Sequence, residues 1–162
     1  MTNTAPTAAD PITDERLTAT GLLEEVRAGL QEAFASQFAE QGLSPLEFEV
    51  LLRLARSPQH RLRMADLAAQ VLMSASGLTR VADRLEAAGL LERSSCSEDR
   101  RGTWAAATPA GMARLRAMLP GHLEVIERWY TGVLSPDELD LLIRLLRKIR
   151  DVVRPGAVAG VA

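Results

Sequence analysis

Residues 64–94 read MADLAAQVLMSASGLTRVADRLEAAGLLERS, and this stretch divides into two helices. Residues 64–71 have helical apolar spacing, which breaks at Leu72-Met73. Ser74 is a residue type that caps helices, and it starts a second helix that we expect to run to Ala88. Gly89 then stands where a helix C-cap glycine belongs. Two helices with so short a break predict a helix-turn-helix, whose second member is the recognition helix.

Two short strands are expected after the second helix. Residues 90–94 and 103–107 have strand character, and the polar, charged segment 95–102 between them predicts a hairpin with a long loop. The second strand, TWAAA, is a poor strand former, so we expect it to be short, with Trp104 supplying the packing. Helix, helix and hairpin in this order predict a winged helix-turn-helix.

Two further helices precede this unit. The first begins near Thr13, carries an apolar stripe at three- and four-residue spacing and stops at Gly42. Ser44-Pro45-Leu46-Glu47 then forms a capping box with proline at the first helical position. The helix that follows is expected to end at Ser57-Pro58 and to turn four residues inward, namely Phe48, Leu51, Leu52 and Ala55.

Two helices also follow the hairpin. Thr108-Pro109 caps and opens the first, which Pro120-Gly121 should kink or interrupt before it resumes through Trp129-Tyr130. Ser135-Pro136-Asp137-Glu138 repeats the capping-box pattern, and the last helix stops at Pro155. One face of that helix is expected to be apolar and to consist of Leu139, Leu142, Leu145, Leu146, Ile149, Val152 and Val153.

The terminal helices carry apolar stripes that a central unit of roughly 60 residues cannot bury alone. Packing against a second copy therefore predicts a two-fold homodimer. The expected fold is mainly α with a small β-hairpin wing, a winged helix-turn-helix flanked by dimerisation helices. Its expected divisions are a disordered tail at 1–11, an N-terminal dimerisation helix at 12–42, the DNA-binding lobe at 43–111, C-terminal dimerisation helices at 112–154 and a disordered tail at 155–162.

Composition excludes several classes of protein. Of the 162 residues 47% are hydrophobic and 25% charged, which supplies a core and argues against wholesale disorder. We expect no transmembrane helix, because no apolar run approaches about 18 residues, and the N-terminus does not have the pattern of a secretory signal. A single cysteine, Cys96, excludes an internal disulfide framework and a cysteine-based metal cluster. We therefore expect a cytoplasmic protein that binds no membrane.

The charge is unevenly distributed. The formal net charge of −2 by itself argues against a nucleic-acid binder. Residues 60–116, however, carry nine arginines against six acidic residues, whereas residues 1–59 carry four arginines against nine acidic residues. The basic excess thus coincides with the predicted helix-turn-helix and hairpin, and it matters only if those arginines share one surface.

Small and polar residues fill the first turns of the recognition helix. Ser74, Ser76 and Thr79 can donate to bases or phosphates, and Arg80 can reach a guanine edge or a phosphate. Small residues such as Gly77 let the backbone approach the floor of the major groove. The N-terminus of the helix adds the positive end of its dipole near phosphate.

Other arginines have more than one interpretation. Arg84 lies further along the helix, where it can contact phosphate or pair with Asp83 or Glu86. Arg61 and Arg63 precede the helix-turn-helix and either contact phosphate or are simply exposed.

The hairpin tip carries two adjacent arginines, Arg100 and Arg101. A wing of this reach can place arginine in a minor groove, where narrow A·T tracts deepen the negative potential. Asp99 is expected to pair with an arginine and to fix the aim of the tip.

The stretch from Leu43 to Gly111 resembles the MarR family of transcriptional regulators. The resemblance rests on several short motifs in this order: LSPLEFEVL at 43–51, LA at 67–68, SGLTR at 76–80, RLE at 84–86, AGLLER at 88–93, DRRG at 99–102 and TPAG at 108–111. It implies a cytoplasmic homodimer on a pseudo-palindromic operator, and binding of a ligand. We expect the protein to be a repressor and the ligand to be a small aromatic or phenolic effector. The resemblance also implies that Asp99 and Arg101 reach the minor groove, and that the recognition helix contacts DNA through Ser74, Ser76, Gly77, Thr79 and Arg80.

The remaining signals favour ordinary structural roles. Cys96 lies in the wing, away from the position of the redox cysteine in one branch of the family, and we interpret it as an ordinary thiol. His60 and His122 form no spacing typical of a metal site, and no cofactor is expected. The aromatic pairs Trp129-Tyr130 and Phe34-Phe38 either line a pocket or belong to the core.

No enzyme is expected either, because the sequence has no phosphate loop and no nucleophile motif. The alternative function is a winged-helix module that binds protein without specific DNA binding. Such a module would need neither the basic tip nor the small-residue recognition helix.

Overall fold

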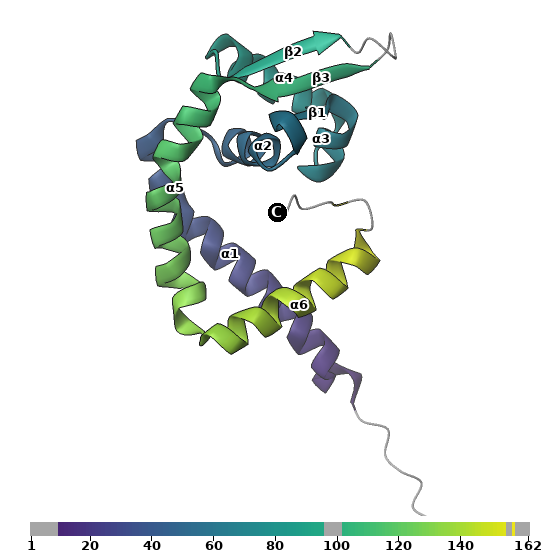
Figure 1. The fold of residues 1–162 in the computed structure, drawn as a ribbon. Coiled ribbons are helices and arrows are strands. Elements are labelled where there is room, and N and C mark those ends of the chain that lie inside the picture. Colours follow the sequence, from purple (N-terminus) through teal and green to yellow (C-terminus); the bar gives the residue numbers. More distant parts are fainter. Residues whose placement is uncertain (1–9, 96–101, 155–156, 158–162) are drawn as a thin grey trace, which may run out of the picture.

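The computed structural model describes residues 10–95, 102–154 and 157, and it separates a lobe of short helices and a small sheet from three long helices (Figure 1). The helices are α1 (Glu15–Gln41), α2 (Pro45–Ala55), α3 (Met64–Gln70), α4 (Ala75–Ala87), α5 (Pro109–Trp129) and α6 (Pro136–Val153). The strands are β1 (Arg61–Arg63), β2 (Leu91–Ser95) and β3 (Thr103–Ala107), and three 3-10 turns are η1 (Pro11–Thr13), η2 (Pro58–His60) and η3 (Thr131–Val133).

The stop at Gly42 and the capping box at Ser44 are confirmed, whereas α1 begins at Glu15 rather than at Thr13 and α2 ends at Ala55. Gly42 ends α1 in the left-handed region at φ 63°, which glycine adopts without steric cost. Ser44 and Glu47 form the predicted capping box of α2, with the Ser44 amide donating to Glu47 over 2.8 Å. Asp10 and Pro11, which the sequence assigned to the N-terminal tail, belong to the start of η1.

The helix-turn-helix is formed by α3 and α4. Ser74 caps α4, accepting a hydrogen bond from the Gly77 amide over 3.1 Å, and Gly89 follows the helix with φ 70°. Leu78, Val81, Ala82 and Leu85 form the buried face of α4. These four residues recur at three- and four-residue spacing, so the opposite face of the helix is exposed.

The small sheet differs from the expected hairpin because it has three strands. β1 pairs antiparallel with β3, giving the order β1-β3-β2. Strand β1 was not expected from the sequence, because a three-residue strand is too short to show a periodic pattern. β3 is as long as β2 and lies at the centre, because pairing on both sides and the complete burial of Ala105 offset its low strand propensity.

One core joins the lobe to the base of the long helices. Its fully buried side chains come from α2, α3, α4, α5 and the two strands β2 and β3. The largest are Val50, Leu51, Leu54, Leu67, Leu78, Leu85, Leu91, Leu115 and Met118. Of the four α2 residues expected to face inward, Phe48 and Leu51 are buried, while Leu52 and Ala55 are partly buried.

Of the kink or interruption expected at Pro120, the interruption is wrong. α5 runs as one helix from Pro109 to Trp129 with Pro120 inside it, because proline removes only its own amide hydrogen bond and the remaining turns still close. α5 therefore begins inside the expected lobe at 43–111 and continues through the expected dimerisation segment (Figure 1).

The long helices leave much apolar surface uncovered. No residue of α6 is buried, and on it Leu141, Leu145, Ile149, Val152 and Val153 are exposed. α1 and η1 expose five more, namely Ile12, Leu17, Leu22, Leu23 and Val26. Among the described residues, no helix is both long and apolar enough to cross a membrane.

Candidate nucleic-acid interface

The N-terminal turns of α4 present small polar groups outward. Ser74, Ser76 and Thr79 are exposed, as is Arg80. The Ser74 and Ser76 hydroxyls lie 3.2 Å apart, and the Thr79 hydroxyl donates to the Ala75 carbonyl over 2.9 Å. These hydroxyls are therefore held in fixed positions on the helix surface while their remaining lone pairs or hydrogens stay accessible.

Gly77 is the tightest position in these turns. A Cβ at residue 77 would lie 3.1 Å from the Ser74 hydroxyl and 3.2 Å from Cε of Met73. Since Ser74 is the cap of the helix, a side chain at Gly77 would disturb the cap itself. Gly77 thus has a structural reason for its identity in addition to its expected closeness to DNA.

Arg84 does not pair with the neighbours that the sequence suggested. Its Nε donates to Oε1 of Glu47, on α2, over 2.7 Å. Burial alone would raise the pKa of Glu47, but hydrogen bonds from Arg84 and Ser44 outweigh it and hold that pKa below its usual value. The sequence did not suggest this partner because the two residues are 37 positions apart.

The carboxylates of α4 bind the wing instead. The guanidinium group of Arg93, on β2, lies 2.7 Å from Asp83 and donates through Nε to Glu86 over 3.0 Å. The side-chain hydrogen bond from Arg93 lowers the pKa of Glu86. Arg93 thus attaches the first strand of the wing to the recognition helix, a role that sequence reasoning missed.

Arg61 and Arg63 flank the wing on β1, and both lie over Trp104 of β3. Their guanidinium carbons are 4.8 Å and 5.5 Å from the ring centroid, within cation–π range. Trp104 therefore packs against arginine on one face of the sheet, while Ala105, next along the strand, enters the core. Both arginines are held beside the base of the wing.

The wing tip lies outside the described residues. Asp99, Arg100 and Arg101, together with Cys96, belong to that segment, so their expected roles stay predictions. The strands that lead to it are described, and β2 and β3 extend together from the lobe toward the tip (Figure 1).

In sequence and in fold, the chain is similar to a known group of proteins. A model of the MarR family matches residues 41–102. The HTH-type transcriptional regulator YkoM of Bacillus subtilis, itself uncharacterised, is 38% identical over 110 residues, which cover 67% of this chain and 69% of that protein. The chain belongs to the MarR family.

Two solved MarR-like structures extend the similarity over most of the chain. Sco3205 of Streptomyces coelicolor, a MarR family transcriptional regulator solved in complex with DNA, is 28% identical with a TM-score of 0.79, covering 88% of this chain and 94% of that one. BpsR of Bordetella bronchiseptica, whose DNA binding is regulated by 6-hydroxynicotinic acid, is 26% identical with a TM-score of 0.71, covering 83% and 99%. MarR proteins are transcriptional regulators and not enzymes, so the expected fold and functional class are confirmed.

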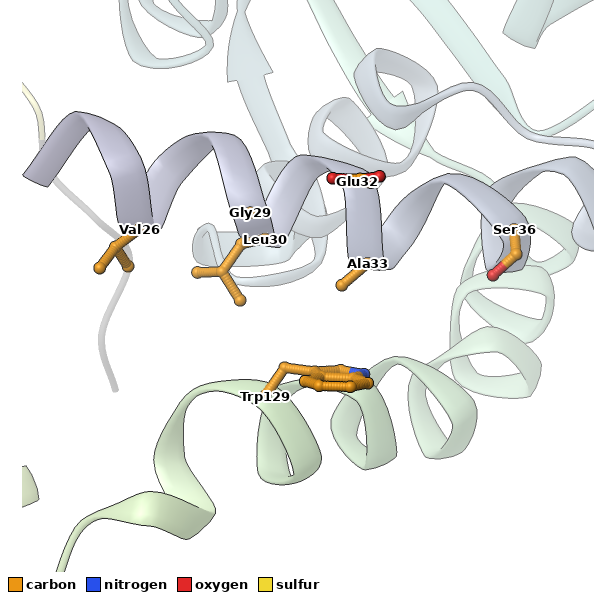
Figure 2. A pocket seen from close by; sticks show the side chains of 7 residues that line it. All are labelled: Val26, Gly29, Leu30, Glu32, Ala33, Ser36 and Trp129. Carbon is orange, nitrogen blue, oxygen red and sulfur yellow. The ribbon is translucent and has the colours of Figure 1, made fainter.

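This MarR chain also has a cavity away from the nucleic-acid interface. A hollow of about 550 Å³ lies between α1 and the end of α5, where the Trp129 indole faces α1 across from Val26, Leu30 and Ala33 (Figure 2). Gly29, Glu32 and Ser36 complete the lining. Of the two aromatic pairs weighed above, Trp129 lines this cavity, whereas Phe38 is buried in the core.

A cluster of rings joins the long helices of this MarR protein to its lobe. His122 of α5 lies against Phe34 and Phe38 of α1 and Phe48 of α2, with centroids 4.4, 5.9 and 4.5 Å away. Its Nδ1 is 3.0 Å from the Gln37 side-chain oxygen. Burial lowers the pKa of His122, while the charge of Glu49 opposes that shift.

Proposed function

We propose that this MarR protein acts in the cytoplasm as a homodimer that binds a pseudo-palindromic operator and represses transcription, and that a small aromatic ligand releases it. The observation that carries the proposal is the division of α4 into two faces. Leu78, Val81 and Leu85 anchor one face in the core, while Ser76, Thr79 and Arg80 lie exposed on the other. A helix so anchored can enter the major groove as a rigid unit.

In this proposal the two reading elements have different roles. Ser74, Ser76, Gly77, Thr79 and Arg80 contact bases and phosphates in the major groove, and the helix N-terminus favours a phosphate. The wing places Arg100 and Arg101 in the flanking minor groove, with Asp99 fixing their direction. Arg84 acts indirectly in this proposal, because its guanidinium group is bound by Glu47.

The apolar surface of α1 and α6 supports the homodimer. α6 has no buried residue in the single chain, and Ile149 and Val153 on it are 55% and 67% exposed. Apolar helix faces this extensive are typical of obligate interfaces between copies of one chain. A two-fold dimer presents two recognition helices about one helical turn of DNA apart, and its bound footprint excludes other proteins from the operator.

The cavity beside Trp129 supports the ligand. An indole wall and three aliphatic side chains suit a flat apolar ring, and Ser36 offers a polar contact at its edge. Because α1 and α5 both line the cavity, a ligand there changes the relative position of two helices that we assign to the dimer. A ligand that favours a dimer with mis-spaced recognition helices shifts the population away from DNA.

Selection of duplexes from a random-sequence pool, followed by titration at two salt concentrations, tests the proposal. We expect an inverted repeat, bound more tightly than unselected DNA at both salt concentrations. Recovery of no preferred sequence, with only weak salt-sensitive binding, would instead favour the alternative of a winged-helix module that binds protein. Adding 6-hydroxynicotinic acid or a simple phenol to the selected complex tests release.

A further inference from the structure

The two carboxylate oxygens of Glu47 bind two different parts of the protein. Oε2 accepts from the Ser44 amide over 2.8 Å and from the Ser44 hydroxyl over 2.9 Å, which closes the N-terminal cap of α2. Oε1 accepts from Nε of Arg84 on the recognition helix over 2.7 Å. Only 12% of the Glu47 side chain is exposed, so the carboxylate is held from both sides with little access to water.

Arg84 lies on the same stripe of α4 as Arg80, one helical turn further along. Its guanidinium group nevertheless extends to the first turn of α2 and is bonded there. Apart from the ion pairs of Asp83 and Glu86 with Arg93 of β2, the side-chain contacts that hold α4 to the rest of the described lobe are apolar. They are made through Leu78, Val81 and Leu85. Apolar contacts resist separation but are not directional, whereas a charged hydrogen bond depends on distance and angle and therefore restrains how far a helix can shift or turn at that point.

The first turn of α2 is connected in turn to the end of α1. Only residues 42–44 separate the two helices, with Gly42 in a left-handed turn and Leu43 buried. Arg114 of α5 donates to the carbonyl group of Gln41, which fixes the same corner from the other side. The Glu47–Arg84 bond therefore links the corner between the long helices and the lobe directly to the helix that reads DNA.

We infer that Glu47 is a positioning residue for the recognition helix, which it holds at a fixed angle to the α1–α2 corner through Arg84. This inference rests on the proposed function. In this inference Arg84 does not contact phosphate. It binds Glu47 and so couples the position of α4 to that of α2. When the end of α1 moves, α4 then moves with it. Without the bond, α2 could slide over the apolar face of α4.

Four variants separate this role from direct DNA contact. Glu47→Gln keeps the capping box, because glutamine serves at this position too, but it removes the charge that Arg84 binds. Arg84→Gln removes the other partner, and its exposed side chain is not needed for the core. Glu47→Gln/Arg84→Gln completes the double-mutant cycle. Glu49→Gln is the matched control, because Glu49 forms an ion pair of equal length, 2.7 Å, with Arg53 on its own helix.

Each variant is titrated with the wild-type-selected duplex at two salt concentrations. We expect Glu47→Gln and Arg84→Gln each to weaken binding roughly three- to tenfold, the double variant to be no weaker than either, and the salt slope to stay as in the wild type. Glu49→Gln should bind like the wild type. An Arg84→Gln slope reduced by about one, together with tighter binding by Glu47→Gln, would show that Arg84 contacts phosphate and would overturn the inference. Unchanged affinity in both single variants would overturn it as well.

Hydrogen–deuterium exchange of the intact protein gives a second readout that needs no DNA. We expect faster exchange of the α4 amides in Glu47→Gln than in Glu49→Gln, and equal exchange would contradict the inference. If the wild type selects no duplex at all, the proposed function fails, while the exchange result still decides whether Glu47 holds α4.

Discussion

The imidazole of His122 stacks on the ring of Phe34, with centroids 4.4 Å apart and planes at 21°. This contact joins α5 to α1, and Phe48 brings α2 to the same ring. Burial among these rings lowers the pKa of His122, against the opposing charge of Glu49, so the folded chain favours the neutral imidazole.

The lowered pKa of His122 predicts a pH dependence of stability. Neutral His122 contributes fully to the free energy of unfolding above pH 6.5, the pKa in the unfolded chain. This contribution is lost as the pH falls from 6.5 through the lower pKa of the folded chain, because the unfolded chain then binds more protons than the folded chain. Thermal unfolding at about pH 7.5 and about pH 5.5 checks this for the wild type and for His122→Phe. We expect a larger loss of Tm in the wild type, and equal losses in both proteins would contradict the prediction.

Gly111→Ala should destabilise the fold. A Cβ at residue 111 would collide with the Leu90 carbonyl group and would lie 3.3 Å from Leu51 in the core, so strand β2 and helix α5 would have to separate. The free energy of unfolding should fall by about 1–3 kcal/mol, measured by urea denaturation. Gly121→Ala is the control in the same helix, because its Cβ would make only an ordinary 3.6 Å contact with Gln37, and a loss of equal size there would refute the steric explanation.

Arg101→Ala tests the wing. If Arg101 lies in the minor groove, its loss should weaken binding of the selected operator by about tenfold and reduce the slope of log affinity against log salt by about one. Arg16→Ala, at the far end of α1 and paired with Asp14, is the control for loss of a positive charge. An unchanged operator affinity for Arg101→Ala would rule out the proposed wing contact.

Leu146→Glu tests the dimer. The Leu146 side chain is on the apolar face of α6, and a carboxylate buried there without a partner should raise the dimer dissociation constant on the order of 100-fold and abolish tight operator binding. Analytical ultracentrifugation measures the first effect and titration with operator the second. Leu142→Glu should behave in the same way, whereas the exposed Lys148→Glu should remain dimeric. A monomeric Leu146→Glu that still binds the operator tightly would contradict the proposed architecture.

Much of the fold could be predicted because its signals are local. The caps at Ser44, Ser74, Thr108 and Ser135 each bond an amide three residues ahead, so four consecutive letters contain both partners. The glycines that end helices are equally local, because the left-handed conformation concerns one residue. The recognition helix and its exposed polar turns were predicted for this reason.

Other parts of the candidate site depend on residues far apart in the chain. Strand β1 forms by pairing with β3, which lies more than forty residues further along the chain. The cavity forms because Trp129 of α5 faces α1. Neither arrangement leaves a periodic pattern in the sequence, and both depend on how the helices pack.

The sequence by itself determined where most of the helices begin, which face of each is apolar and which small polar residues occupy the first turns of α4. Hydrogen bonds and side-chain spacing within a few residues specify those properties. Only the tertiary structure decided which charges meet. Arg84 binds Glu47 rather than Asp83 or Glu86. The carboxylates of Asp83 and Glu86 bind Arg93 instead. The physical reason is that an arginine pairs with whichever carboxylate the packed core brings within hydrogen-bonding distance, and the distances in space follow from the packing of α2, α4 and the sheet rather than from separation along the chain.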